Sequence, residues 1–185
     1  MKSGVAQRIL RGPSLCVVLV AVWASVPEPA PTRVSAESRS GAVEAAVPAV
    51  HTVSGHFTRV VVVRLKNNVD MLEGLKTAVA REKIKNAVIL SGAGSLVSYH
   101  VHVVSNTSFP PTNAFTQGAG PYDLLTTTGY IINGRIHAHI TFSDTQKALG
   151  GHLEPGTRVF TFAVIALGVL DEGTSLERFD DYSWR

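Results

Sequence analysis

The sequence predicts an α+β fold, in which one main helix packs on a mainly antiparallel sheet or partial barrel. One strand-like segment and one helix-like segment come first, and five further strand-like segments follow without a second helical pattern. Two of the later segments are joined by Asn133-Gly134, the strongest short signal for an antiparallel hairpin. The chain is 45% hydrophobic and only 17% charged, so its 185 residues can bury a core.

The predicted domain opens with a strand and a helix. Residues 57–66, FTRVVVVRLK, are rich in β-branched side chains around a continuous apolar centre, as expected of a buried strand. Residues 67–85 place apolar side chains at roughly helical spacing, and either Asp70 or Asn68 can cap a helix there.

The middle of the domain is predicted to be strand and loop. Residues 86–106 predict a strand, a tight turn and a second strand, since Gly92 and Gly94 permit a turn or a close approach of two backbones. Residues 109–121, FPPTNAFTQGAGP, predict a loop because they are rich in proline and glycine.

The last part of the domain is predicted to be all strand. Residues 122–133 and 135–144 form the two arms of the predicted hairpin. Residues 157–170, TRVFTFAVIALGVL, predict a final long apolar strand, and residues 172–185 form a polar tail.

The N-terminus has the pattern of an export signal. A cationic segment precedes the ten apolar residues LCVVLVAVWA, and Val22 and Ala24 suit a cleavage site after residue 24. Ten residues span roughly 15 Å as a helix, about half of a bilayer core, so no stable membrane span is expected. Residues 1–24 therefore predict export to the periplasm or the medium, and without this signal the protein would be cytoplasmic.

A single domain is expected over residues 56–171. Residues 25–55 contain four prolines and little periodicity, which predicts a disordered linker. The only cysteine, Cys16, lies in the predicted signal, so a mature chain would have no disulfide. Beyond residue 24 there are 14 Lys and Arg against 14 Asp and Glu, which offers no overall positive field for nucleic acid.

Three histidines follow one another closely in the segment GRIHAHITFSDTQKALGGHL. His137 and His139 point to the same side of a strand, because successive side chains alternate between its faces. The two glycines before His152 permit a path that brings a third imidazole near the first two. Three neutral histidines with an open fourth position are typical of zinc sites and also suit other divalent ions.

Other residues could join this site. His100 and His102 repeat the same spacing in another predicted strand, and Glu154 could orient a ligand or act as a base on a zinc-bound water. The alternative is that the histidines lie at the surface or at contacts between subunits and bind no metal. Whether a bound metal would serve catalysis, sensing, storage or structure stays open, so no catalytic residue is assigned.

The segments GPYDLLTTTGYI, GRIHAHITFSD and LGGHLEPGTRVFTFAVIAL resemble the plants-and-prokaryotes-conserved (PPC) domain, and residues 59–101 resemble its opening strand, helix and glycine-serine segment. The resemblance covers about residues 56–171. It implies an α+β fold, a homotrimer, and a divalent metal on His137, His139 and His152, as in bacterial members.

The same resemblance raises DNA binding as an alternative function. Plant relatives join the domain to an AT-hook, the segment R-G-R-P, which enters the minor groove. This chain contains no such segment. Its absence, the neutral mature charge and the predicted export all disfavour a DNA-binding role, and a module that binds a ligand or assembles without metal is the third possibility.

Overall fold

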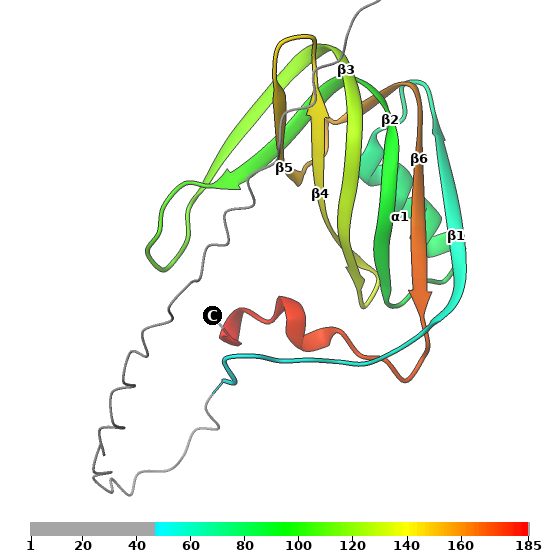
Figure 1. The fold of residues 1–185 in the computed structure, drawn as a ribbon, viewed down its shortest axis with the longest axis vertical. Coiled ribbons are helices and arrows are strands. Elements are labelled where there is room, and N and C mark those ends of the chain that lie inside the picture. The colour runs from blue at the N-terminus through cyan, green and yellow to red at the C-terminus, as the bar shows by residue number, and fades with distance from the viewer. Residues whose placement is uncertain (1–46, 185) are drawn as a thin grey trace, which may run out of the picture. The chain divides into compact units, whose positions relative to one another are not determined.

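The computed structural model describes residues 47–184 of the chain (Figure 1). The strands are β1 (Phe57–Lys66), β2 (Ala87–Val104), β3 (Asn113–Ile132), β4 (Arg135–Ser143), β5 (Ala148–Leu153) and β6 (Arg158–Leu170). The helices are α1 (Met71–Arg81) and two short 3-10 helices, η1 (Glu177–Asp180) and η2 (Tyr182–Trp184). The predicted export signal and the predicted linker up to residue 46 lie outside the described residues.

The six strands form one antiparallel sheet in the order β1-β6-β2-β3-β4-β5, with α1 against one face (Figure 1). β5 pairs with β4 and also, through Val101 with Leu153 and His102 with His152, with β2. The sheet therefore curls back on itself at β5, which lies between β4 and the end of β2. The expected α+β class, a mainly antiparallel sheet with one helix, is confirmed.

α1 begins and ends with local capping signals. The carboxylate of Asp70 accepts hydrogen bonds from the backbone amides of Leu72 and Glu73, as predicted for an N-cap. The helix stops before residue 85 because Lys83 adopts a positive φ of 52° and the amide of Ile84 donates to the carbonyl of Val79. Within residues 47–184, no helix is long and apolar enough to cross a membrane.

The core lies between α1 and the face of the sheet that α1 covers. Met71 and Leu75 of α1 are almost completely buried, as is Phe142 of β4. The ring of Phe142 contacts those of Tyr99 and Tyr122, with centroids 4.6 and 5.5 Å away. This core fixes β4 from its inner face and leaves the alternate side chains of β4 on the outer face of the sheet.

β1 is an edge strand and not the buried strand that its composition predicts. Its only partner in the described sheet is β6, and it contributes Val63 and Leu65 to the core. Val60 and Val62 lie on the other face and are 57% and 65% exposed. The continuous apolar run therefore has one face in the core and one apolar face in solvent.

The sequence predicts a tight turn at the glycines within residues 86–106. The structure has no turn there, and residues 87–104 form one long strand, β2. Gly92 and Gly94 lie inside β2, where a Cβ would collide with the side chain of Thr127 and the carbonyl of Phe162, respectively. The glycines thus serve close approach of neighbouring strands.

β3 begins earlier than the predicted loop allows, since residues 113–119 pair with the second half of β2. The pairing satisfies the backbone of this glycine-rich stretch and outweighs its low strand propensity. The Asn133-Gly134 turn is confirmed, with φ of 51° and 76° at its two residues.

Candidate metal centre

Strand register places three histidines in one row across the sheet. His139 of β4 pairs with His152 of β5, and His152 pairs with His102 of β2. Directly paired residues project their side chains from the same face, so these three imidazoles are neighbours. His137 lies two residues before His139 and shares its face. The face opposite carries the buried residues Val101, Ala138, Ile140 and Leu153.

The three histidines predicted from the sequence form a nearly equilateral triangle. The ring centroids of His137 and His139 lie 5.4 Å apart, those of His137 and His152 5.0 Å, and those of His139 and His152 5.3 Å. Three imidazoles that bind one tetrahedral ion at about 2.0–2.1 Å place their centroids about 5 Å apart. The ring spacing in this set therefore matches that of a three-histidine site, but its donor nitrogens do not all lie within 4.8 Å of one another, so the rings would have to turn to share an ion.

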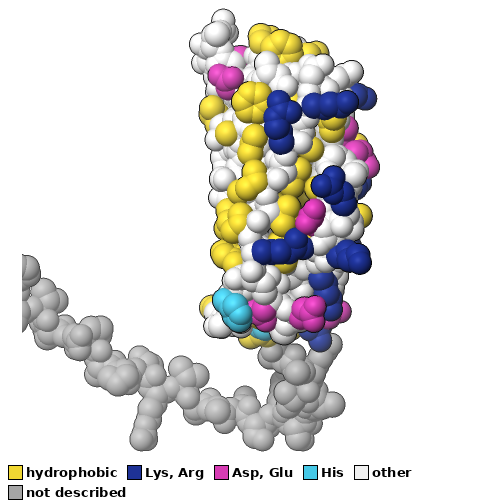
Figure 2. Space-filling model, turned by 90° about the vertical axis from the view of Figure 1, so that its right-hand side faces the viewer, with side chains coloured by type: hydrophobic (Ala, Val, Ile, Leu, Met, Phe, Trp, Pro, Cys, Tyr) yellow, Lys and Arg dark blue, Asp and Glu magenta, His cyan; other side chains and the backbone are white. Residues whose placement is uncertain are grey.

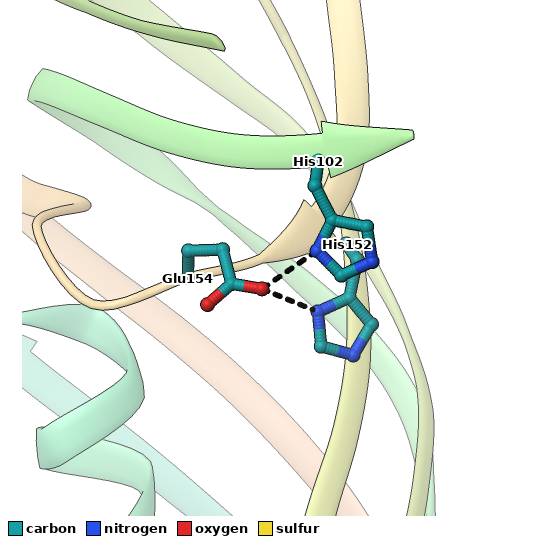
Figure 3. A group of neighbouring side chains, drawn as sticks. All are labelled: His102, His152 and Glu154. Carbon is teal, nitrogen blue, oxygen red and sulfur yellow. Dashed lines mark hydrogen bonds and ion pairs between the residues drawn. The ribbon is translucent and has the colours of Figure 1, made fainter. Parts of the chain in front are cut away.

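A second set on the other side of His152 has donor atoms that already converge (Figure 3). The carboxylate oxygen Oε1 of Glu154 lies 2.6 Å from Nδ1 of His102 and 3.4 Å from Nδ1 of His152. Donor atoms of these three residues lie within 4.8 Å of one another, and among the described residues no other His, Cys, Asp or Glu group does so. The rings of His102 and His152 are stacked, 4.5 Å apart.

His152 is common to both sets, and its Nδ1 is a buried nitrogen without a hydrogen bond. The 3.4 Å contact with Glu154 is an electrostatic contact whose geometry does not make it a hydrogen bond. A buried polar atom without a partner is costly unless an ion or a small movement satisfies it. A small movement toward Glu154 would satisfy Nδ1 and leave Nε2 of His152 for an ion, so the residues present fit a metal ion that His152 helps to hold.

His100 does not join the cluster, although its spacing from His102 matches that of His137 from His139. Its Nδ1 lies 2.8 Å from the carbonyl oxygen of Pro155, and its backbone bonds to Thr157. Sequence reasoning raised His102 and Glu154 as further members, and the register of β5 with β2 brings both beside His152. It did not raise Asp180, which lies 3.9 Å from Nδ1 of His137 and has no local sequence signal.

A profile of the plants and prokaryotes conserved (PCC) domain matches residues 52–171. The chain belongs to this family. The family is the one also abbreviated PPC, so the resemblance seen in the sequence is confirmed. No curated protein matches the chain.

Solved structures with the PCC-domain fold have names that point to different roles. A metal-containing protein from Archaeoglobus fulgidus has a TM-score of 0.56 at 18% identity, covering 65% of this chain and 86% of its own. A protein from Bacteroides thetaiotaomicron named as a candidate DNA-binding protein has a TM-score of 0.54 at 17% identity, covering 64% and 85%. A PPC protein from Pyrococcus horikoshii has a TM-score of 0.53 at 20% identity, covering 67% and 85%. These similarities establish the fold.

A lowered pKa favours the neutral, metal-binding form at two histidines of the cluster, His139 and His152. Burial lowers the pKa of His139, and the neighbouring imidazoles of His137 and His102 lower it further. Burial also lowers the pKa of His152, as do the three other imidazoles, while the Glu154 carboxylate acts in the opposite direction. Both shifts reduce the competition between protons and a metal ion for the ring nitrogens.

The stability of the metal-free protein should therefore fall as the pH drops below about 6.5. The unfolded chain takes up protons at these two histidines near their ordinary pKa of 6.5, whereas the folded chain does so only at lower pH. Their stabilising effect is thus complete above 6.5 and is lost as the pH falls from 6.5 through the lowered folded values. Urea unfolding at several pH values measures this loss of stability in the wild type and in a His139→Gln, His152→Gln double variant. An equal pH slope in the two proteins would contradict it.

Proposed function

We propose that this PCC-domain protein binds one divalent transition-metal ion per chain, zinc, through His137, His139 and His152. The near-equal spacing of their three rings is the observation that carries the proposal. Three neutral nitrogen donors suit Zn²⁺ and leave one coordination position open, where a bound water becomes more acidic. The name of the Archaeoglobus fulgidus protein, which is metal-containing, supports the same role.

Glu154 and His102 flank this ligand set. With Oε1 facing Nδ1 of His152, Glu154 can accept its proton, fix the tautomer and leave Nε2 for the ion. The hydrogen-bonding contact between Glu154 and His102 holds the carboxylate in place. A carboxylate that orients a metal-bound histidine raises the basicity of that ligand, so both residues are expected to support binding.

Metal analysis of the purified protein tests the proposal. The full chain, purified without a His tag, should contain zinc, and the metal-free form should take up one Zn²⁺ per chain with the release of protons. Elemental analysis and calorimetric titration measure both. A protein that stays free of metal after exposure to Zn²⁺, Co²⁺ and Ni²⁺ would overturn the proposal.

We also propose that the protein assembles as a homotrimer. Within each chain, we describe the curled sheet as a partial barrel. The outer face of the sheet exposes several large apolar side chains, a pattern typical of surfaces that other subunits cover. They are Val60, Val62, Leu125, Phe160 and Phe162. Light scattering should give three times the mass of the chain, and the mass of a monomer would contradict the proposal.

A second candidate function, DNA binding, is favoured by one feature of the charge distribution. Residues 59–85 contain seven of the eleven Lys and Arg within residues 47–184, against three Asp and Glu. Figure 2 looks onto the β1 side, where Lys and Arg side chains lie beside hydrophobic ones. Fluorescence anisotropy with duplex DNA should show binding that weakens steeply with salt and in a Lys83→Glu, Lys85→Glu double variant. Absence of binding at low salt would remove this candidate.

A further inference from the structure

The segment after β6 lies beyond the matched family domain and is nevertheless anchored to it. The backbone amide of Asp171 bonds to the carbonyl of His56, and its carboxylate accepts from the amide of His56 and the hydroxyl of Thr174. The buried side chain of Asn86 donates to the carbonyl of Thr174 and accepts from the amide of Asn133. The segment is thus tied to the β3–β4 turn.

These anchors direct η1 onto the outer face of β3 and β4. Leu176 is buried just before η1, and the ring of His51 packs on Phe179 and on Trp184, with centroid distances of 5.4 and 5.0 Å. The guanidinium of Arg178 lies over the Trp184 ring at 5.3 Å. The end of the chain therefore has a defined position against the domain.

The result is a pocket of about 390 Å³ beside the histidines, with one wall formed by the C-terminal segment. Phe179 and Asp180 line it opposite His137, His139 and Tyr130. Oδ1 of Asp180 lies 3.9 Å from Nδ1 of His137, and Oδ2 lies 3.9 Å from the guanidinium of Arg135. The Asp180 side chain is only 27% exposed, so its charge is partly shielded from water.

We propose that the C-terminal segment, residues 172–184, completes the metal site, with Asp180 as a positioning residue for His137. The inference rests on the proposed metal-binding function. A carboxylate that accepts the Nδ1 proton of a histidine fixes the tautomer and leaves Nε2 for the metal. Glu154 faces Nδ1 of His152 in the same way. Two of the three proposed ligands would then have a carboxylate behind them, one from the family domain and one from the segment that follows it.

The distance of 3.9 Å is an ion-pair distance and longer than a hydrogen bond. His137 would donate its Nδ1 proton more strongly if its Nε2 held a metal ion, and the carboxylate of Asp180 would then approach it more closely. The guanidinium of Arg135 lies 3.9 Å from the other oxygen of Asp180 and so helps to hold the carboxylate at the pocket wall.

Titration of the metal-free full chain with Co²⁺ tests the inference, because its visible absorption reports both affinity and coordination. Asp180→Asn should weaken Co²⁺ binding about 10- to 100-fold and change the absorption spectrum. Asp180→Glu should restore part of the affinity. Asp181→Asn is the matched control, since Asp181 bonds to Arg178 and Ser183 and should leave both readouts unchanged.

The outcomes separate this inference from the proposed function. If the wild type binds Co²⁺ and the Asp180→Asn variant matches it in affinity and spectrum, the role of the C-terminal segment is refuted while metal binding stands. If the wild type binds no Co²⁺, both fail. A loss of folding would lower the unfolding temperature of the metal-free variant. Equal unfolding temperatures for Asp180→Asn and Asp181→Asn therefore assign the weaker binding to the lost carboxylate.

Discussion

His152→Ala is expected to lower the affinity for Zn²⁺ by about 100-fold or more. His152 lies between His139 and His102 in the row across the sheet, and its ring contacts all three other imidazoles of the cluster. His152 belongs to both ligand sets described above, so its removal leaves neither set complete. Competition with a chelator of known affinity measures the loss. Retention of wild-type affinity would remove His152 from the site.

Three further alanine variants test which histidines bind the ion together with His152. His100→Ala removes an imidazole that bonds to the carbonyl of Pro155, outside the cluster, and should leave the affinity close to that of the wild type. His139→Ala should weaken binding more than His102→Ala, because only His139 belongs to the proposed ligand set. The reverse order would place the ion between His102, His152 and Glu154, where the donor atoms already converge.

The fold could be predicted from the sequence wherever the signals are local. β1 occupies the predicted residues 57–66, Asp70, one of the two predicted cap residues, caps α1, and Asn133-Gly134 forms the hairpin turn. The errors lie where pairing between distant segments decides. Residues 113–119 have a loop composition, yet their backbone is satisfied by β2. The exposure of Val62 depends on the outer face of the sheet being uncovered at β1, which no feature within residues 57–66 reveals.

The same division applies to the candidate site. Alternation along a strand was enough to predict that His137 and His139 share a face. It could not show that β5 pairs with two strands at once, which sets His102 and Glu154 beside His152. The position of Asp180 was beyond prediction, since it depends on contacts of Asn86 and Leu176 far from the histidines in sequence.

Gly129→Ala is expected to lower the free energy of unfolding by about 3 kcal/mol or more. Gly129 pairs with Ala138 and has a φ of 135°, which side chains with a Cβ rarely adopt. A Cβ there would also collide with the carbonyl oxygen of His137 and approach the Cα of Ala138 to 2.9 Å. β4 must move away to admit the methyl group, and His137 and His139 move with it. The variant should therefore lose metal affinity as well as stability.

The Gly134→Ala variant measures the cost of backbone strain alone, without the collision expected at Gly129. Gly134 has a φ of 76°, but the nearest heavy atom to its Cβ position is the carbonyl oxygen of Ile84, 4.0 Å away. Its substitution should cost only the left-handed conformation, about 1–2 kcal/mol, and should leave metal binding intact. Urea unfolding and Zn²⁺ titration of both variants compare the two effects. Equal losses at the two glycines would mean that β3 and β4 can separate without cost, and the histidines would then not be held by the close packing of these strands.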